Sequence, residues 1–296
     1  MRVPELRRRT PVVLLRLILI ASACAWLSAA RAGAAEPVPV SSPVPASASA
    51  PLAIGETWTL VSSVLKETRR INVYRPPGVP DGQPLPVMVM PDGGLQEDFL
   101  HVAGLLQVGA GNGTVRPFLL VGIENTERRR DLTGPTDSAR DRSIAPRVGG
   151  SQAFRDFIRK ELLPEVVRRY RTTGETAIVG ESLAGLFVVE TLVLEPDLFD
   201  TYIAIDPSLW WNDGRLARRI AAGLAPRAGR KTLYVALSSD GLATFNPAAP
   251  VAALRRVPEL DVHYEEWPGE THATIYHPAA LKAFRTVLKP APAPAH

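Results

Sequence analysis

The sequence predicts one large α/β domain, a mostly parallel sheet of about eight strands with helices on both faces. Short apolar runs bounded by turn residues recur along the chain, and runs of this length fit strands that are buried on both faces. Helical patterns lie between most of these runs, and strand followed by helix, repeated, is typical of a parallel sheet covered by helices. The chain has 296 residues, 46% of them hydrophobic, which is enough for one such domain.

The predicted elements follow the chain in order. Residues 57–64 and 69–74 alternate between apolar and polar side chains, so they predict an antiparallel hairpin at the start of the domain. The later strands are predicted from apolar runs at 86–90, 118–123, 176–180, 202–205, 232–237 and 261–267. Helices are predicted at 152–170, 183–194, 214–224 and 279–287, from apolar residues with helical spacing or from a nearly all-apolar composition.

Residues 1–35 are predicted to be a secretory signal peptide, because Arg7–Arg9 precede a short apolar run followed by small residues. Arg16 interrupts that run, and a membrane span needs about 20 apolar residues, so cleavage is favoured over a membrane anchor. Lipid attachment at Cys24 is a less favoured alternative, because Ala21 stands where a leucine is usual. We therefore expect a periplasmic or secreted protein with no stable membrane span in its mature form.

Composition also bounds the partners and cofactors. The formal charge is +4, but without residues 1–35 the chain holds 28 basic and 29 acidic residues. Nucleic-acid binding needs a basic surface, so we exclude it. The one cysteine excludes a disulfide framework and a cysteine-based zinc site, and no pattern indicates another metal or an organic cofactor. Residues 36–54, rich in Pro, Ala and Ser, predict a flexible linker, and 289–296 a disordered tail, which leaves the domain at 55–288.

The candidate nucleophile is Ser182. It lies in Gly180-Glu-Ser-Leu-Ala184, where a predicted strand meets a predicted helix. In the elbow of the α/β-hydrolase fold, a serine sits on such a turn, and the turn requires small residues two positions before and two positions after it. The amide of Leu183, at the helix N-terminus, could then stabilise an oxyanion. The alternative is a serine that only caps the helix.

The candidate base is His272, because it follows the last predicted strand and the base comes last in the chain order of α/β hydrolases. His277, five residues later, is the second choice. The acid that orients the imidazole is predicted to be Asp240, at the end of the second-last strand. Asp206, at the end of the strand before, is the alternative, and a dyad of serine and histidine without an acid also stays open. Glu270 is close in sequence but too local to reach the ring squarely.

Further site residues are predicted from two loops and one polar segment. The turn after the strand at 86–90 contains Gly93 and Gly94, whose backbone could bend to supply a second oxyanion donor, or could form only an ordinary turn. The segment 126–150 is rich in arginine, a residue that grips anionic oxygens. Candidate substrate-binding residues there and after the strand at 202–205 are Arg128, Arg130, Trp210 and Trp211. The arginines could instead belong to a solvated loop, and the tryptophans could only pack the core.

Several motifs, in order, resemble one known family. They are Met90-Pro-Asp-Gly-Gly, the segment Val121–Thr133 with Gly-Ile-Glu-Asn-Thr and Arg-Asp-Leu-Thr, the elbow Gly180–Gly185, Asp206-Pro-Ser-Leu-Trp-Trp-Asn and His272-Ala-Thr-Ile. Together they resemble the putative esterase family of α/β hydrolases, which includes enterobactin-type siderophore esterases. Glu181 departs from the family elbow, which has histidine there, and Ala184 stands for its glycine.

The resemblance implies a serine esterase that hydrolyses carboxylic esters through an acyl-enzyme, with Ser182 and His272 as nucleophile and base. These motifs are specific for the family and not for the substrate. The export signal, the arginine-rich segment 126–150 and the pair Trp210-Trp211 predict an anionic, aromatic ester as the small-molecule substrate, with a siderophore such as a catecholate lactone as the leading candidate. The alternative is an acyltransferase or a non-catalytic binding protein, because the fold does not decide the function. A non-catalytic relative would usually lose the serine or the histidine, and both are present.

Overall fold

The structure is a computed structural model that describes residues 49–223 and 229–290. The described residues from Leu52 onward form one compact unit, and residues 49–51 before it have no regular secondary structure. The predicted signal peptide with Cys24, most of the predicted linker and the end of the tail lie outside these residues. Within the described ranges, no helix is long and apolar enough to cross a membrane.

Eight strands form a single sheet in the order β1-β2-β4-β3-β5-β6-β7-β8. Strands β1 and β2 form the predicted antiparallel hairpin, β2 pairs antiparallel with β4, and all other neighbours are parallel. The fold prediction is therefore confirmed. The bounds are β1 Glu56–Ser62, β2 Glu67–Tyr74, β3 Leu85–Pro91, β4 Leu119–Ile123, β5 Thr172–Glu181, β6 Thr201–Ile205, β7 Lys231–Ser238 and β8 Leu260–Trp267.

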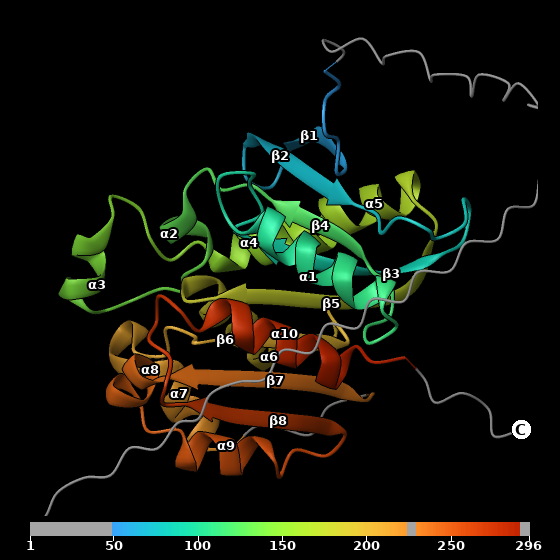
Figure 1. Ribbon diagram of the computed structural model, residues 1–296. Coiled ribbons are helices and arrows are strands. Elements are labelled where there is room, and N and C mark those ends of the chain that lie inside the picture. Colours follow the sequence, from blue (N-terminus) through green and yellow to red (C-terminus); the bar gives the residue numbers. More distant parts are fainter. Residues whose placement is uncertain (1–48, 224–228, 291–296) are drawn as a thin grey trace, which may run out of the picture. The chain divides into compact units, whose positions relative to one another are not determined.

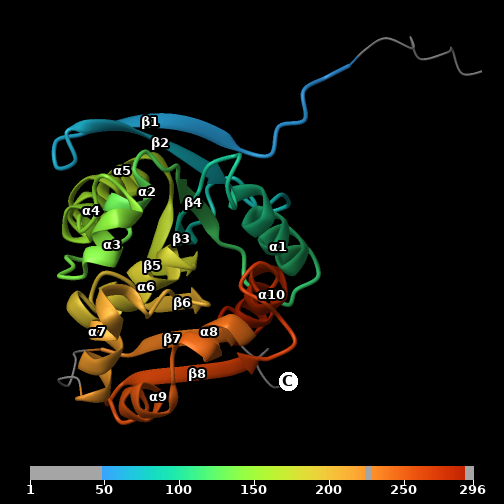
Figure 2. The same cartoon turned by 90° about the vertical axis from the view of Figure 1, so that its left-hand side faces the viewer.

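Helices cover both faces of the sheet (Figure 2). Helices α1 (Phe99–Gly111) and α10 (Tyr276–Val287) pack on one face. The other face carries α4 (Ser151–Phe157), α6 (Leu183–Leu194), α7 (Trp211–Ala221) and α9 (Ala248–Leu254). Along β3, Val87 and Val89 pack in the core on the face of α6, whereas Met88 and Met90 pack in the core on the face of α1 and α10. Both sides of the strand are apolar because both are buried, which is why its sequence is a continuous apolar run.

The helices differ from the predicted ones in detail. The predicted helix 152–170 is three pieces, because a π-helical turn at Ile158–Leu162 separates α4 from α5 (Leu163–Arg169). Helix α7 starts three residues before the predicted position, through a left-handed stretch that includes Asn212. Short helices that the sequence patterns did not predict are α2 (Arg128–Asp131), α3 (Ala139–Ile144), α8 (Ser239–Thr244) and α9. Each spans seven residues or fewer, too short for a clear helical period.

The carboxyl ends of the parallel strands meet at one edge of the sheet. In Figure 1 the arrows of β7 and β8 point towards this edge, and α2, α3 and α8 lie on that side. Strand β3 lies between β4 and β5, so the chain leaves it in one direction to β4 and later resumes on its other side with β5. In open α/β sheets, ligands bind in the crevice outside the carboxyl ends of the strands at such a switch point.

Candidate active site

Ser182 lies on a sharp turn between β5 and α6. Its backbone has φ 60° and ψ −120°, a conformation that costs free energy for any residue with a side chain and persists only when the surroundings enforce it. The turn is held from β6, because the amide of Ser182 donates to the carbonyl of Ile205 at 3.1 Å. This is the predicted elbow between strand and helix.

The small residues around Ser182 are required by close contacts. A Cβ atom on Gly180 would lie 2.7 Å from the Cβ of Ala184, closer than two carbon atoms can approach. A Cβ atom on Gly185 would lie 3.0 Å from the carbonyl oxygen of Ile205. Ala184 itself is fully buried and fits, so alanine at this position, where the family has glycine, is compatible with the elbow.

The hydroxyl of Ser182 is the first member of a hydrogen-bonded series of three side chains. The Nε2 atom of His272 lies 3.0 Å from Ser182 Oγ. The Nδ1 atom of the same ring lies 2.6 Å from Asp206 Oδ2. The distances are those of hydrogen bonds, and the order is that of nucleophile, base and acid. Sequence reasoning missed Ser208, whose hydroxyl lies 3.4 Å from that of Ser182.

Contacts other than that with the imidazole also hold the carboxylate of Asp206 in place. It follows β6 directly, with φ 42°, and its carboxylate accepts from the amide of Ser238 at 2.8 Å and from its hydroxyl at 2.7 Å. A Cβ atom on Gly241 would lie 2.2 Å from Asp206 Oδ1, so glycine leaves room for the carboxylate. Burial opposes ionisation, but the hydrogen bonds from His272 and Ser238 prevail and lower the pKa of Asp206.

Asp240, the preferred acid of the sequence analysis, does not contact the imidazole ring. It lies in the first turn of α8, and its Oδ2 accepts from the backbone amide of His272 at 2.8 Å. Asp240 therefore binds the backbone of the loop that carries the histidine, whereas Asp206 is hydrogen-bonded to the imidazole ring. Glu270 accepts from Ser239 through its backbone carbonyl. The ring of His277 packs 5.0 Å from that of His101, and His277 does not line the pocket of Ser182.

The surroundings of His272 favour its protonated form. The hydrogen bond to Asp206 raises the pKa of His272, burial opposes the shift, and the charge of Glu181 adds to it. The side chain is 44% exposed, so solvent reaches the ring from one side. A base in this position can accept a proton from Ser182 and keep it while the new charge is neutralised by the carboxylate.

One predicted oxyanion donor fits and the other two do not. The amide of Leu183 is the first in α6, and the first amides of a helix have no acceptor within it. The amide of Gly93 already donates to Ile123 O at 3.0 Å, and that of Gly94 to Glu97 Oε2 at 2.6 Å. In this conformation neither glycine is available for an oxyanion. Gly93 serves packing instead, because a Cβ atom there would lie 2.3 Å from Gly122 Cα.

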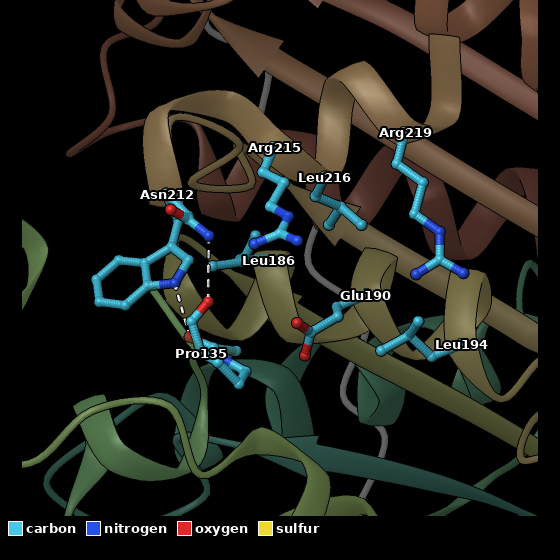
Figure 3. A pocket seen from close by; sticks show the side chains of 10 residues that line it. Pro135, Leu186, Glu190, Leu194, Asn212, Arg215, Leu216 and Arg219 are labelled. Atoms are coloured by element: carbon cyan, nitrogen blue, oxygen red, sulfur yellow. Dashed lines mark hydrogen bonds between the residues drawn. The ribbon is translucent and has the colours of Figure 1, made fainter. Parts of the chain in front are cut away.

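The two predicted tryptophans face different pockets. Trp210 lines a pocket of ≈ 250 Å³ together with Ser182, Asp206 and His272, so it can contact a bound substrate. Trp211 is buried, and its Nε1 donates to Gly134 O at 2.9 Å. It lines a separate pocket of ≈ 270 Å³ between α6 and α7 (Figure 3). Trp211 therefore packs in the core, the alternative given for the tryptophans, and does not line the pocket of Ser182.

The two predicted arginines are already engaged with carboxylates. Arg128 forms a two-bond fork on Asp92, at 2.7 and 2.8 Å. The Arg130 side chain is 16% exposed and bonds Glu67 at 2.8 Å and Asp131 at 2.6 Å. Each of the two arginines therefore pairs with a carboxylate that balances its charge.

Arg129 lies between them and is not among the substrate-binding residues that the sequence predicts. Its guanidinium contacts only the carbonyl of Ile144, at 3.2 Å, and within the described ranges it has no carboxylate partner. It lines a pocket of ≈ 550 Å³ whose other residues are Glu127, Arg128, Arg130, Ala145, Pro146 and Arg147. Arg147 is paired with Glu127. The other three arginines of the pocket are paired with carboxylates, so Arg129 carries the one charge in it that no acidic side chain balances.

The part of the chain that the structure describes holds no group of three His, Cys, Asp or Glu side chains able to bind a metal ion.

A family model described as "Putative esterase" matches residues 62–274. The chain is 40% identical over 199 residues to ferri-bacillibactin esterase BesA of Bacillus subtilis, covering 62% of this chain and 67% of that protein. It is 33% identical over 140 residues to siderophore triacetylfusarinine C esterase of Aspergillus fumigatus, covering 44% and 46%.

Solved structures agree in fold. An IroE-like serine hydrolase from Shewanella oneidensis superimposes with a TM-score of 0.69 at 27% identity, covering 79% of this chain and 80% of that chain. Siderophore hydrolase EstB from Aspergillus nidulans gives a TM-score of 0.69 at 23% identity, covering 86% and 100%. The second likeness concerns the fold alone.

Proposed function

We propose that this chain, which belongs to the Putative esterase family and hydrolyses ester bonds, uses Ser182 as its nucleophile and acts on siderophore esters. The observation that carries the first part is the linked series Ser182–His272–Asp206, with hydrogen bonds of 3.0 and 2.6 Å. No other hydroxyl within the described ranges sits on a comparable elbow with an imidazole beside it.

The geometry supports a two-stage reaction. His272 Nε2 takes the proton of Ser182 as Oγ attacks the ester carbonyl carbon, and Asp206 stabilises the imidazolium. The carbonyl oxygen becomes an oxyanion beside the amide of Leu183. The bond to the alkoxy oxygen then breaks, His272 gives its proton to the departing alcohol, and an acyl-enzyme remains. In the second stage water gives a proton to His272, attacks the acyl carbon, and the acid leaves as Ser182 regains its proton.

Three features support a siderophore ester as the substrate. Several relatives are named for siderophores: ferri-bacillibactin, enterobactin and triacetylfusarinine C. The basic pocket around Arg129 offers a charge that no carboxylate balances, and guanidinium groups bind anionic oxygens such as carboxylate or catecholate. Trp210, which lines the pocket of Ser182, can stack against an aromatic acyl group.

The test is a hydrolysis panel with the purified protein. It compares p-nitrophenyl acetate, a feruloyl ester and a ferric triscatecholate lactone, with Ser182→Ala as the blank. We expect turnover of all three by the native protein, with the highest kcat/KM for the ferric lactone, and none by the variant. Hydrolysis of the p-nitrophenyl ester alone would contradict the siderophore proposal, but it would still agree with esterase activity. Activity in Ser182→Ala would contradict the assignment of the nucleophile.

We also propose export to the periplasm or the medium, with removal of residues 1–35. The support is the arginine-rich start, the short apolar run and the small residues that follow it. Expression of the full chain in a Gram-negative host, followed by fractionation and mass spectrometry of its N-terminus, tests this. A protein that stays in the cytoplasm with residues 1–35 intact would contradict the proposal, and a lipid on Cys24 would select the anchored alternative.

A further inference from the structure

A second carboxylate faces the catalytic imidazole from the side opposite Asp206. Glu181 is the last residue of β5 and directly precedes Ser182. Its Oε1 lies 3.4 Å from His272 Nε2, and its side chain is 16% exposed. The reaction described above makes no use of this group, although it lies beside the nitrogen atom that exchanges the proton.

The charges around Glu181 come from several elements. His272 follows β8, Arg128 lies on α2, Asp98 directly precedes α1 and Asp206 follows β6. Burial raises the pKa of Glu181 to about 7, the two cations act against this shift, and the two aspartates add to it. A buried carboxylate must be paired or protonated, and the imidazole is the nearest group that can supply the pair. The protonation of Glu181 and that of His272 are therefore coupled near neutral pH.

The position of Glu181 has two opposite consequences for the base. After the serine attacks, His272 carries a proton on each ring nitrogen, with Asp206 beside Nδ1 and Glu181 beside Nε2. An ionised Glu181 stabilises this imidazolium and helps to hold the ring at the hydroxyl. In the free enzyme the same attraction keeps the ring protonated, and thus unable to act as a base, up to a higher pH.

We propose that Glu181 is a positioning residue that holds the protonated ring of His272 from its Nε2 side, opposite Asp206, and thereby sets the lower pH limit of the esterase. This inference rests on the proposed function, because it assumes that His272 is the base. It concerns how the base is tuned and is independent of which ester is the natural substrate.

The test is Glu181→Gln, which keeps the size of the side chain and removes its charge. The pH profile of kcat/KM for p-nitrophenyl acetate is measured for both proteins. In the variant we expect the midpoint of the acidic limb to fall by about half a unit or more. The plateau should fall by about threefold to tenfold, because the imidazolium loses one of its two carboxylates. Glu270→Gln is the matched control, since His272 forms ion pairs with Glu181 and Asp206 and not with Glu270, and its profile should equal the native one.

A second measurement separates this proposal from the proposed function. In Ser182→Ala, with and without Glu181→Gln, the titration of His272 is followed by NMR, which needs no substrate. A lower pKa of His272 in the double variant supports the proposal even if no ester in the panel is hydrolysed. An unchanged midpoint together with an unchanged titration of His272 would overturn it. Circular dichroism of each variant shows whether a lost plateau reflects lost fold.

Discussion

The sheet edge around Ser182 and the polar segment 126–150 contain similar charged side chains but arrange them differently. At the edge, Asp206 bonds an imidazole that can gain or lose a proton near neutral pH. In the segment, Arg128 and Arg130 bond carboxylates through guanidinium groups that stay charged throughout that range. The first arrangement can transfer a proton, whereas the second maintains geometry.

The comparison teaches that the partner of a charged residue decides what the residue can do. Arg128, Arg129 and Arg130 are consecutive and chemically identical, yet only Arg129 lacks a carboxylate among the described residues. Asp206 and Asp240 both follow parallel strands at the same edge, yet only Asp206 meets the ring of His272. We therefore expect substitutions at the edge to lower activity and substitutions in the segment to lower stability. Arg129 is the exception, because it should affect substrate binding and not stability.

The largest effect is expected from Ser182→Ala, which removes the nucleophile at the edge. Loss of one member of a catalytic unit removes nearly all of the rate that the unit supplies, so kcat should fall by about 10⁴-fold or more. A fluorophosphonate probe should label Ser182 in the native protein, as checked by mass spectrometry of the labelled peptide. Labelling at a different serine would show that the edge is not the reactive site. His272→Ala in addition to Ser182→Ala should cost little more, because the two act together.

The next largest effect separates the two aspartates of the edge. Asp206→Asn should lower kcat by up to about 10⁴-fold, because the amide neither fixes the tautomer of His272 nor stabilises its charge. Asp240→Asn should cost no more than about tenfold, since it weakens one hydrogen bond to the backbone of the loop. Steady-state kinetics on p-nitrophenyl acetate measures both. Equal and mild losses would indicate a dyad, and a greater loss at Asp240 would contradict the observed geometry.

In the polar segment, the larger effect should be on stability. Arg130→Ala removes the bonds to Glu67 and to the buried Asp131, which should lower the free energy of unfolding by about 1.5–3 kcal/mol. Arg129→Ala is the matched control, because its guanidinium bonds only a carbonyl, and its effect should stay within about 0.5 kcal/mol. Urea unfolding followed by circular dichroism compares them. Equal stability of the two variants would contradict the structural role of Arg130.

A smaller effect should identify the part of the segment that binds substrate. Arg129→Ala should raise KM for an anionic ester by about threefold to tenfold, as expected for one exposed charge. KM for the neutral p-nitrophenyl acetate should stay as it is in the native protein. If KM rises equally for both esters, the basic pocket does not recognise charge, and the role proposed for Arg129 falls.

The smallest effect concerns pH and again distinguishes the two regions. The pKa of His272 is raised above its usual 6.5, so more of the base is protonated at any given pH, and the activity should be lost on acidification with a midpoint above 6.5. Arginine pairs do not titrate in this range, so Arg129→Ala should leave the midpoint unchanged. The pH profile of kcat/KM for p-nitrophenyl acetate measures both. A native midpoint below 6.5 would show that burial outweighs the carboxylates.

Local patterns were sufficient to predict the strands, the turn at Ser182 and the histidine that lies beside it. The continuous apolar run of β3 is visible in the sequence because both sides of that strand are buried. Gly180 and Gly185 can be recognised beside Ser182 because the tight turn excludes larger side chains at both positions, and both lie within three residues of the serine. His272 was chosen as the candidate base from chain order alone, and the structure places its Nε2 atom 3.0 Å from Ser182 Oγ.

Contacts between distant parts of the chain decided the rest. Asp206 is 66 residues from His272 in the sequence, and Asp240 is 32 residues from it; nothing local tells which carboxylate meets the ring and which meets the backbone. The amide of Gly94 is taken by Glu97, and Arg130 by Glu67, so residues with suitable chemistry are not available. Sequence periodicity reports which side of an element is buried, but the direction of each polar side chain depends on donors and acceptors that only folding brings together.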